Sequence, residues 1–264
     1  MIETRHADGK LVLTEADGIA TIRFNAPERR NAMSLAMWHA LADVAQALPE
    51  STRVVILTGT GDKAFVSGAD ISEFATLRST PAQVAAYNAA VHRALSAVAA
   101  LPMPVIAQIR GYCIGGGLEI ATRCDLRLAA EGARFAFTPA KLGLAVAADE
   151  VAALARLIGP AAASDLLFTA RQVPAEDALR WGLIDRLVPV EELAATTQDV
   201  AIQIARNAPL TLRAVKAALR AGPNPDDATR AAVEAQVAAC FASADYAEGQ
   251  AAFAEKRAPV FQGK

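Results

Sequence analysis

The sequence predicts an α/β protein in which an N-terminal core, residues 1–190, is followed by a helical region, residues 191–264. Buried-type strands at residues 53–58 and 104–109 each lead into a glycine-containing turn and then into a helical pattern. Strand patterns recur as far as Leu187-Val188, and beyond that point the pattern is helical.

Other elements follow from the same local signals. Two β-prone runs flank the turn Ala16-Asp17-Gly18 and predict a hairpin. Ser34 precedes apolar residues at helical spacing, as a helix N-cap does. The expected elements are hairpin strands at 11–15 and 19–24, helices at 34–48 and 81–101, a strand at 126–129, and one or two helices within 227–257.

Composition limits the classes of partner. The chain has 264 residues, of which 53% are hydrophobic, and this is enough to build a large buried core. The formal net charge of −2 provides no basic field of the kind that nucleic-acid binding requires. We therefore expect small-molecule partners and further copies of the same chain, and no nucleic acid.

The sequence also predicts a cytoplasmic protein without a membrane segment. The first ten residues, MIETRHADGK, do not resemble a signal peptide. The most apolar stretch, residues 94–109, is interrupted by two prolines and is too short to span a bilayer. Cys113, Cys124 and Cys240 are odd in number and lack metal-ligand spacing, which predicts free thiols and no metal site.

Two glycine-containing turns are the candidate binding elements. Gly115-Gly116-Gly117 lies between a predicted strand and a helix, where glycine lets a ligand approach the backbone closely. Free N–H groups at the start of the helix would suit a developing oxyanion. Ser67-Gly68-Ala69-Asp70 forms a second such turn, with Asp70 placed as a cap. Neither turn has the P-loop or dinucleotide-binding pattern, so the cradling of a phosphate group by these turns is disfavoured.

These turns and their surroundings resemble the enoyl-CoA hydratase/isomerase (crotonase) family over the whole chain. The resemblance implies the ClpP/crotonase spiral of strand-strand-helix repeats with a C-terminal helical trimerisation region. It also implies an acyl-CoA substrate, a role in fatty acid metabolism, and a homotrimer or dimer of trimers. Coenzyme A is then part of the substrate, and no separate cofactor is expected. The matching segments are Phe24-Asn25, Asn31-Ala32-Met33, residues 64–71, residues 111–119, Cys124-Asp125, residues 141–144, Gly159-Pro160, residues 169–171, residues 178–183, Val188-Pro189, Glu248-Gly249 and residues 253–257.

The resemblance also implies roles for individual residues. The oxyanion-hole amides fall on Ala69 and Gly116, which like Glu119 count among the catalytic groups. Arg29 or Arg30 is the candidate phosphate contact, and Phe253 and Lys256 would reach the ligand of a neighbouring subunit. For Arg29, Arg30 and Lys256, an ordinary solvated surface charge is an equally good interpretation. The residues expected along coenzyme A are Arg29, Arg30, Ser67, Ala69, Asp70, Ile71, Gly115, Gly116, Phe253 and Lys256.

The sequence departs from the family pattern at the second catalytic glutamate. Hydratases of the family use two carboxylates, and the first falls on Glu119. The second position falls on Pro139, which cannot transfer a proton. Asp149 and Glu150 follow in a region that the family places near the acyl chain, so either is a candidate replacement, although Glu150 could equally be a helix-start residue. The small apolar segment at 145–148 predicts an acyl pocket of altered shape.

Several functions remain open at this point. The leading hypothesis is an enoyl-CoA hydratase or enoyl-CoA isomerase that stabilises a thioester enolate, with Glu119 as the acid/base. The alternatives are a non-catalytic acyl-CoA-binding member and other family chemistry, namely thioester hydrolysis or decarboxylation. A serine hydrolase is disfavoured because the Gly-x-Ser-x-Gly nucleophile elbow is missing from the sequence.

Overall fold

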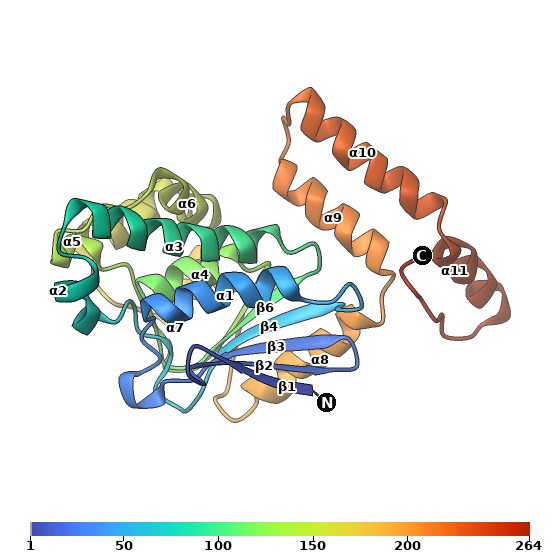
Figure 1. Cartoon of the computed structure of the whole chain (residues 1–264). Coiled ribbons are helices and arrows are strands. Elements are labelled where there is room, and N and C mark those ends of the chain that lie inside the picture. The colour runs from blue at the N-terminus through green and yellow to red at the C-terminus, as the bar shows by residue number, and fades with distance from the viewer. Residues whose placement is uncertain (1) are drawn as a thin grey trace.

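The computed structural model describes residues 2–264 and consists of two sheets surrounded by helices (Figure 1). The strands are β1 (Ile2–His6), β2 (Leu11–Ala16), β3 (Ile19–Phe24), β4 (Val54–Gly59), β5 (Ala64–Val66), β6 (Val105–Ile109), β7 (Tyr112–Ile114), β8 (Leu126–Ala130), β9 (Arg134–Ala136), β10 (Val173–Pro174) and β11 (Arg186–Val188). The α-helices are α1 (Leu35–Ala47), α2 (Phe74–Leu77), α3 (Pro81–Ala100), α4 (Gly116–Arg123), α5 (Pro139–Leu142), α6 (Ala148–Thr169), α7 (Ala175–Trp181), α8 (Leu193–Ala205), α9 (Pro209–Ala221), α10 (Asp227–Phe241) and α11 (Ala244–Glu255). Two 3-10 helices, η1 (Pro27–Arg29) and η2 (Ile71–Glu73), complete the described elements.

The two sheets are built by a repeating unit. The larger sheet has the order β1-β2-β3-β4-β6-β8-β11, and the smaller has the order β10-β9-β7-β5. The pairs β4/β5, β6/β7 and β8/β9 each contribute one strand to the larger sheet and the next to the smaller. A helix follows each pair, and β3, β4, β6, β8 and β11 are mutually parallel. The predicted α/β spiral of strand-strand-helix repeats is confirmed.

Successive side chains along the strands of the larger sheet point to opposite faces and so belong to two different apolar clusters. In β4, Val55 and Leu57 belong to the main core cluster, which includes α1 and α3, whereas Val54 and Ile56 face α8. Both faces of the central strands are therefore covered, which explains their continuous apolar sequence. Trp38 of α1 and Tyr87 of α3 are among the largest fully buried side chains. Both also line a cavity that Gly116 and Glu119 of α4 border.

Most of the expected elements are present. The hairpin is β2 and β3, paired around Asp17-Gly18. The Ser34 hydroxyl accepts a hydrogen bond from the backbone N–H of Met37 at the start of α1, as an N-cap does. Thr80 and Gln83 form a capping box at the start of α3. The strands β1, β5, β7, β9 and β10 were not expected from the sequence. Of these, β5 and β7 occupy segments where glycine-containing turns were expected.

Among the described helices, α6 alone is long and apolar enough to meet a length-and-composition test for a membrane span. Its backbone is broken at Gly159, where φ is 75° and ψ is 162°, and Pro160 follows. Each half has about ten residues, which is half of the roughly 20 that a membrane-spanning helix needs. Its buried residues, among them Leu154 and Leu166, belong to the main core.

The C-terminal region divides differently from the expected boundary near residue 190. Helix α8 packs on the larger sheet, where Leu193, Val200 and Ala201 are buried against the strands. The helices that extend away from the sheets begin with α9 (Figure 1). The oligomerisation role of residues 191–264 stays a prediction.

A buried ion pair joins α9 to the core. The Lys216 ammonium donates to the Met103 carbonyl at 2.5 Å and lies 2.5 Å from the Asp125 carboxylate. Asp125 also accepts a hydrogen bond from the backbone N–H of Val105 at 2.7 Å. Lys216 is 5% exposed, so this contact fixes α9 against the amino ends of β6 and β8.

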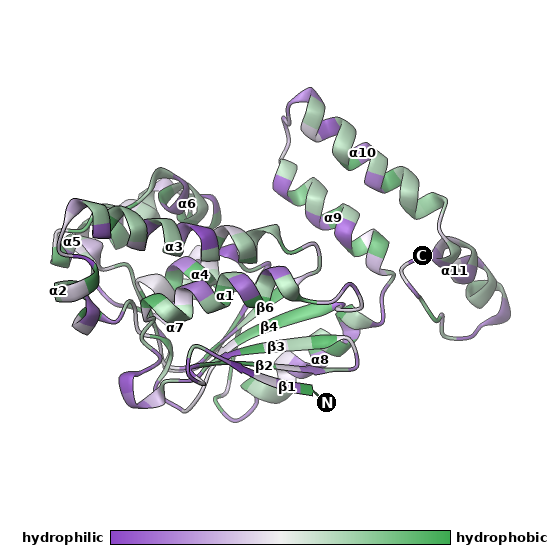
Figure 2. Ribbon diagram, viewed as in Figure 1, coloured by the Kyte–Doolittle hydropathy of each residue, from purple (hydrophilic) through white to green (hydrophobic). Residues whose placement is uncertain are grey.

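Apolar side chains remain exposed along the three C-terminal helices. Figure 2 shows apolar residues along α9 and α10, which stand apart from the sheets. A groove between these helices and α11 has a volume of about 790 Å³. A second copy of the chain is the covering that the sequence predicts for this surface. Its exposed large residues are Val215, Leu219, Val237, Phe241, Tyr246 and Phe253.

Helix α4 begins in close contact with β5. A Cβ atom at Gly117 would lie 2.3 Å from the Val66 carbonyl oxygen, and one at Gly116 would lie 2.8 Å from the Trp38 ring. Real Cβ atoms do not approach so closely, so a side chain at either position displaces α4. These two glycines are therefore required by packing.

We expect Gly117→Ala to lower the free energy of unfolding by about 1–3 kcal/mol, because the added methyl group collides with the backbone of β5. Urea denaturation monitored by circular dichroism measures the change. The matched control is Gly249→Ala in α11, where the new Cβ would be 3.7 Å from the Phe261 ring. That variant should be as stable as wild type or slightly more stable. Equal stability of the Gly117→Ala variant and wild type would contradict the packing argument.

Candidate active site

The two glycine turns lie side by side. Strands β5 and β7 are parallel neighbours in the smaller sheet, and one turn follows each of them. A Cβ built on Gly115 would be 3.7 Å from the Gly68 Cα, so the two backbones are almost in contact. Met33 fixes the first turn, since its N–H donates to the Gly68 carbonyl and its carbonyl accepts from the Asp70 N–H, both at 2.8 Å.

The N–H groups of Ala69 and Gly116 follow these two glycines. Within residues 2–264, neither N–H donates to a protein acceptor. Gly68 has φ +116°, and Gly115 has φ +53° and ψ −117°, which L-residues rarely adopt. Gly116 is also the first residue of α4, whose helix dipole places partial positive charge there. The arrangement provides two unused donors on adjacent turns.

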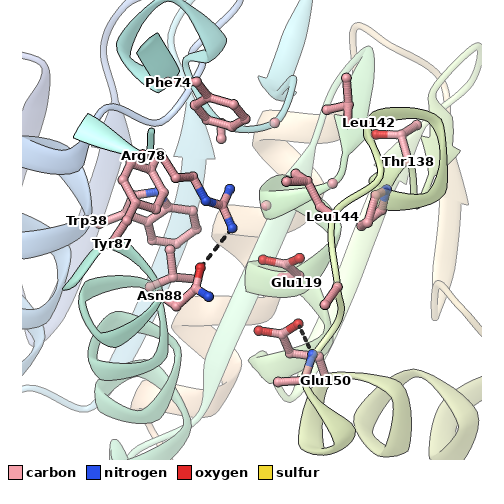
Figure 3. A pocket seen from close by; sticks show the side chains of 18 of the residues that line it. Trp38, Phe74, Arg78, Tyr87, Asn88, Glu119, Thr138, Leu142, Leu144 and Glu150 are labelled. Atoms are coloured by element: carbon pink, nitrogen blue, oxygen red, sulfur yellow. Dashed lines mark hydrogen bonds between the residues drawn. The ribbon is translucent and has the colours of Figure 1, made fainter. Parts of the chain in front are cut away.

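A cavity of about 460 Å³ opens beside the turns. Elements far apart in the sequence contribute to its walls: α1, the turns, α2, α3, α4, α5 and the start of α6 (Figure 3). Of the residues that the sequence analysis singled out, the cavity is lined by Ser67, Ala69, Ile71, Gly115, Gly116, Glu119, Pro139 and Glu150.

Glu119 lies one turn into α4 and faces the cavity (Figure 3). Burial raises the pKa of its carboxyl group to about 8, and the negative charge of Glu150 acts in the same direction. The positive charges of Arg78 and Arg123 act in the opposite direction. At neutral pH the carboxyl group is therefore mostly protonated, and it is able to act as a proton donor.

Glu150 faces the same cavity from the first turn of α6, close to Glu119 (Figure 3). Its carboxylate accepts a hydrogen bond from the backbone N–H of Ala147 at 3.2 Å, so it also caps the helix. Burial raises the pKa of Glu150, while the bond to Ala147 opposes the rise. The carboxyl groups of Glu119 and Glu150 thus form a pair, although Pro139 stands where the family resemblance places the second glutamate.

Other residues singled out in the sequence have partners outside the cavity. The Asp149 carboxylate pairs with Arg123 at 2.8 Å and lies 3.8 Å from the His92 ring, and it does not line the cavity. The Arg29 guanidinium binds the Asp70 carboxylate at 2.7 Å. Burial raises the pKa of Asp70, but hydrogen bonds from Ser72 and then from Arg29 outweigh it and leave the pKa lowered.

Three further basic or aromatic residues lie at the surface. The Arg30 guanidinium lies 5.5 Å from the centre of the Tyr112 ring. Phe253 is 88% exposed on α11, and Lys256 ends that helix in a left-handed conformation. Within one chain, α11 lies far from α2, α3 and α5, whose residues line the cavity (Figure 1).

One wall of the cavity consists of residues that were not identified as site residues from the sequence. Arg78, Asn88 and His92 line it, together with aromatic side chains of α1, α2 and α3. Tyr87 is one of these aromatic residues, and burial raises the pKa of its hydroxyl to about 12. Arg78 belongs to no motif, and its place shortly before the predicted helix at 81–101 carries no signal of a role. The described part of the chain contains no group of three or more His, Cys, Asp or Glu that could hold a metal ion.

Known proteins agree with this architecture. A family model described as enoyl-CoA hydratase/isomerase matches residues 14–264. A crotonyl-CoA hydratase from Syntrophomonas wolfei is 34% identical and aligns over 96% of this chain and 98% of its own length. A carnitinyl-CoA dehydratase from Salmonella typhi is 37% identical over 80% of this chain and 82% of its own length.

Solved structures agree with the same assignment. The crystal structure of an enoyl-CoA hydratase/carnithine racemase from Magnetospirillum magneticum has a TM-score of 0.90 and is 39% identical, and the match covers 99% of this chain and 97% of that one. With matches of this extent in both sequence and structure, the chain belongs to the enoyl-CoA hydratase/isomerase (crotonase) family.

Proposed function

We propose that the protein adds water to the double bond of a 2-enoyl-CoA thioester, or removes water in the reverse reaction. The observation that carries this proposal is the pair of glutamates, Glu119 and Glu150, in one cavity beside two unused backbone donors. Hydration requires one carboxylate to accept a proton from water and a second acid to donate one to carbon. Relatives named as a hydratase and a dehydratase support this reaction class.

Each group has a role in the proposed reaction. The N–H groups of Ala69 and Gly116 hold the thioester oxygen as negative charge develops on it. Glu150 accepts a proton from water while the water oxygen bonds to the β carbon. The protonated Glu119 then donates its proton to the α carbon. Two carboxyl groups with different proton affinities are the usual way to provide an acid and a base in one site.

Movement of the double bond is the second candidate reaction. The proline at position 139 favours it, because a single carboxyl group is sufficient to carry a proton from one carbon to another. Here Glu119 acts alone, and Glu150 serves only to raise the pKa of Glu119 and to cap α6. Thioester hydrolysis, decarboxylation and simple acyl-CoA binding remain weaker alternatives, which a panel of thioesters would separate by their products.

The coenzyme A portion is proposed to extend along the first turn, past Ser67, Ala69 and Ile71, with Gly115 facing it from the second turn. Arg29 and Arg30 remain candidate contacts for the phosphates of coenzyme A. Arg29 would then have to bind a phosphate while it is paired with the Asp70 carboxylate. Phe253 and Lys256 are proposed to reach the site of a neighbouring copy. A cytoplasmic location is proposed from the three free cysteines, since none forms a disulfide within residues 2–264.

We expect Glu119→Gln to lower kcat for crotonyl-CoA hydration by about 10²–10⁴-fold, because the amide cannot transfer a proton. In the hydration mechanism Glu150→Gln should cause a loss of similar size. Steady-state assays of crotonyl-CoA hydration and of 3-enoyl-CoA isomerisation measure both.

The control for these variants is Asp149→Asn, which changes the neighbouring carboxylate outside the cavity and should alter kcat less than about threefold. A large loss in Glu119→Gln only, with isomerisation as the faster reaction, would favour the single-carboxylate mechanism. Full activity of the Glu119→Gln variant would disprove both the two-carboxylate hydration mechanism and the single-carboxylate isomerisation mechanism.

The pH dependence of kcat/KM should show an alkaline limb near pH 8. Glu119 is the acid in the proposed mechanism, and its pKa of about 8 means that the active protonated form is present below that pH and lost above it. Initial rates from pH 5 to 10 with subsaturating substrate measure the limb. An alkaline limb near pH 8 that persists in the residual activity of Glu119→Gln would show that another group titrates.

The exposed apolar surface of α9–α11 predicts that copies of the chain associate, and the family resemblance implies a homotrimer or a dimer of trimers. Light scattering should then give three or six times the 27.5 kDa mass of one chain. Leu219→Glu and Phe241→Glu place charges on this surface, where the side chains are 77% and 64% exposed, and together should reduce the mass. A wild-type mass equal to one chain would contradict the prediction.

A further inference from the structure

Arg78 is a cation held in the active-site cavity. It follows α2 directly, and its guanidinium points into the cavity opposite the wall that carries Glu119 (Figure 3). The Arg78 guanidinium lies 5.0 Å from the centre of the Phe74 ring and 4.9 Å from that of Tyr87. It donates a hydrogen bond to the Asn88 side chain at 2.7 Å. Two aromatic rings and one amide therefore fix its position before any ligand binds.

The positive charge of Arg78 has no close counter-ion. Among residues 2–264, no carboxylate lies within 4.0 Å of its nitrogens, whereas Arg29, Arg123 and Arg127 all have such a partner. The Nε atom of Arg78 is buried and lacks a hydrogen-bond partner among the same residues. A ligand cannot reach this buried Nε atom, but it can meet the charge: a guanidinium without a counter-ion in a cavity is costly unless an anion binds it.

The location of Arg78 decides which part of a substrate it could meet. Arg78 and Glu119 line the same cavity, and the positive charge of Arg78 lowers the pKa of Glu119. If the α and β carbons lie beside Glu119, the group next to Arg78 belongs to the acyl chain and not to the phosphates of coenzyme A. Arginine binds carboxylates through its N–H donors, and the guanidinium of Arg78 points into the cavity while one of its Nη atoms donates to Asn88.

We propose that Arg78 binds a carboxylate on the acyl chain, so that the substrate is the coenzyme A monothioester of a dicarboxylic acid. This inference rests on the proposed function for the placement of the thioester, and it specifies the substrate class of that site. The neutral form of Glu119 is consistent with it, because two ionised glutamates nearby would repel an anionic acyl group. The cavity of about 460 Å³ must also hold the thioester, which favours a short acyl chain.

Binding of saturated thioesters tests the proposal without any turnover. Three matched pairs differ only by a terminal carboxylate: succinyl-CoA and propionyl-CoA, glutaryl-CoA and butyryl-CoA, and adipyl-CoA and valeryl-CoA. Isothermal titration calorimetry on the full-length protein should show tighter binding of the carboxylated member by about 10–100-fold in at least one pair, the size of a charge-assisted contact. Arg78→Met should bring that ratio close to one, and Arg78→Lys should retain part of it.

Arg93→Met is the matched control, since Arg93 lies on α3 and pairs with Asp43 outside the cavity. It removes the same charge and should leave the ratio unchanged. No preference in any pair for the wild-type protein would overturn the proposal, and so would an Arg78→Met variant that weakens both members equally. Failure of the hydration mechanism would be visible only in turnover, so the two proposals fail independently.

Discussion

The site depends on one contact, the close approach of the first residues of α4 to β5 and to the turn that follows it. Gly117 lies against the Val66 carbonyl, Gly116 against Trp38, and Gly115 against Gly68. This contact holds two strand-to-helix turns next to each other. It also directs Glu119, one turn further along α4, into the cavity that the turns border. Larger residues at these positions would move α4, and with it the Gly116 donor and Glu119, away from the Ala69 donor.

The electrostatics of the cavity follow from that packing. Elsewhere buried charges are neutralised by direct partners: Arg127 binds Asp185 at 2.9 Å as well as two backbone carbonyls. In the cavity, Glu119, Glu150 and Arg78 interact through space without forming ion pairs. Ionisable side chains without a direct partner lower the free energy of unfolding of the ligand-free protein. Such a loss of stability is typical of sites whose charged groups bind a ligand.

Much of the fold could be predicted from the sequence, because long periodic elements carry strong signals. The helices α1 and α3 and the hairpin of β2 and β3 have apolar periodicity and caps at their ends. The strands β5, β7 and β9 have three residues each, too few for any period, and pairing between distant segments is what makes them strands. Helix α8 was assigned to the C-terminal region because a helical pattern does not reveal which surface the helix covers.

For the site, the glycine turns and Glu119 could be identified from local motifs. Glu150 could be proposed only as one of two neighbouring acids, since the choice between it and Asp149 depends on which way each side chain points from the start of α6. Arg78 carried no motif at all. Its significance comes from Phe74, Tyr87 and Asn88, which become its neighbours only when α2 and α3 have folded against the cavity.

The ion pair between Lys216 and Asp125 has a consequence for how the molecule can diverge. It binds α9 at the amino ends of β6 and β8, whereas the cavity is built from segments that follow the carboxyl ends of those strands. The same two strands therefore separate the point where α9 attaches from the cavity of the same chain. Substitutions that reshape the cavity walls formed by α3 to α6 require no compensating change at that attachment point, so the pocket and the anchoring of α9 can change independently.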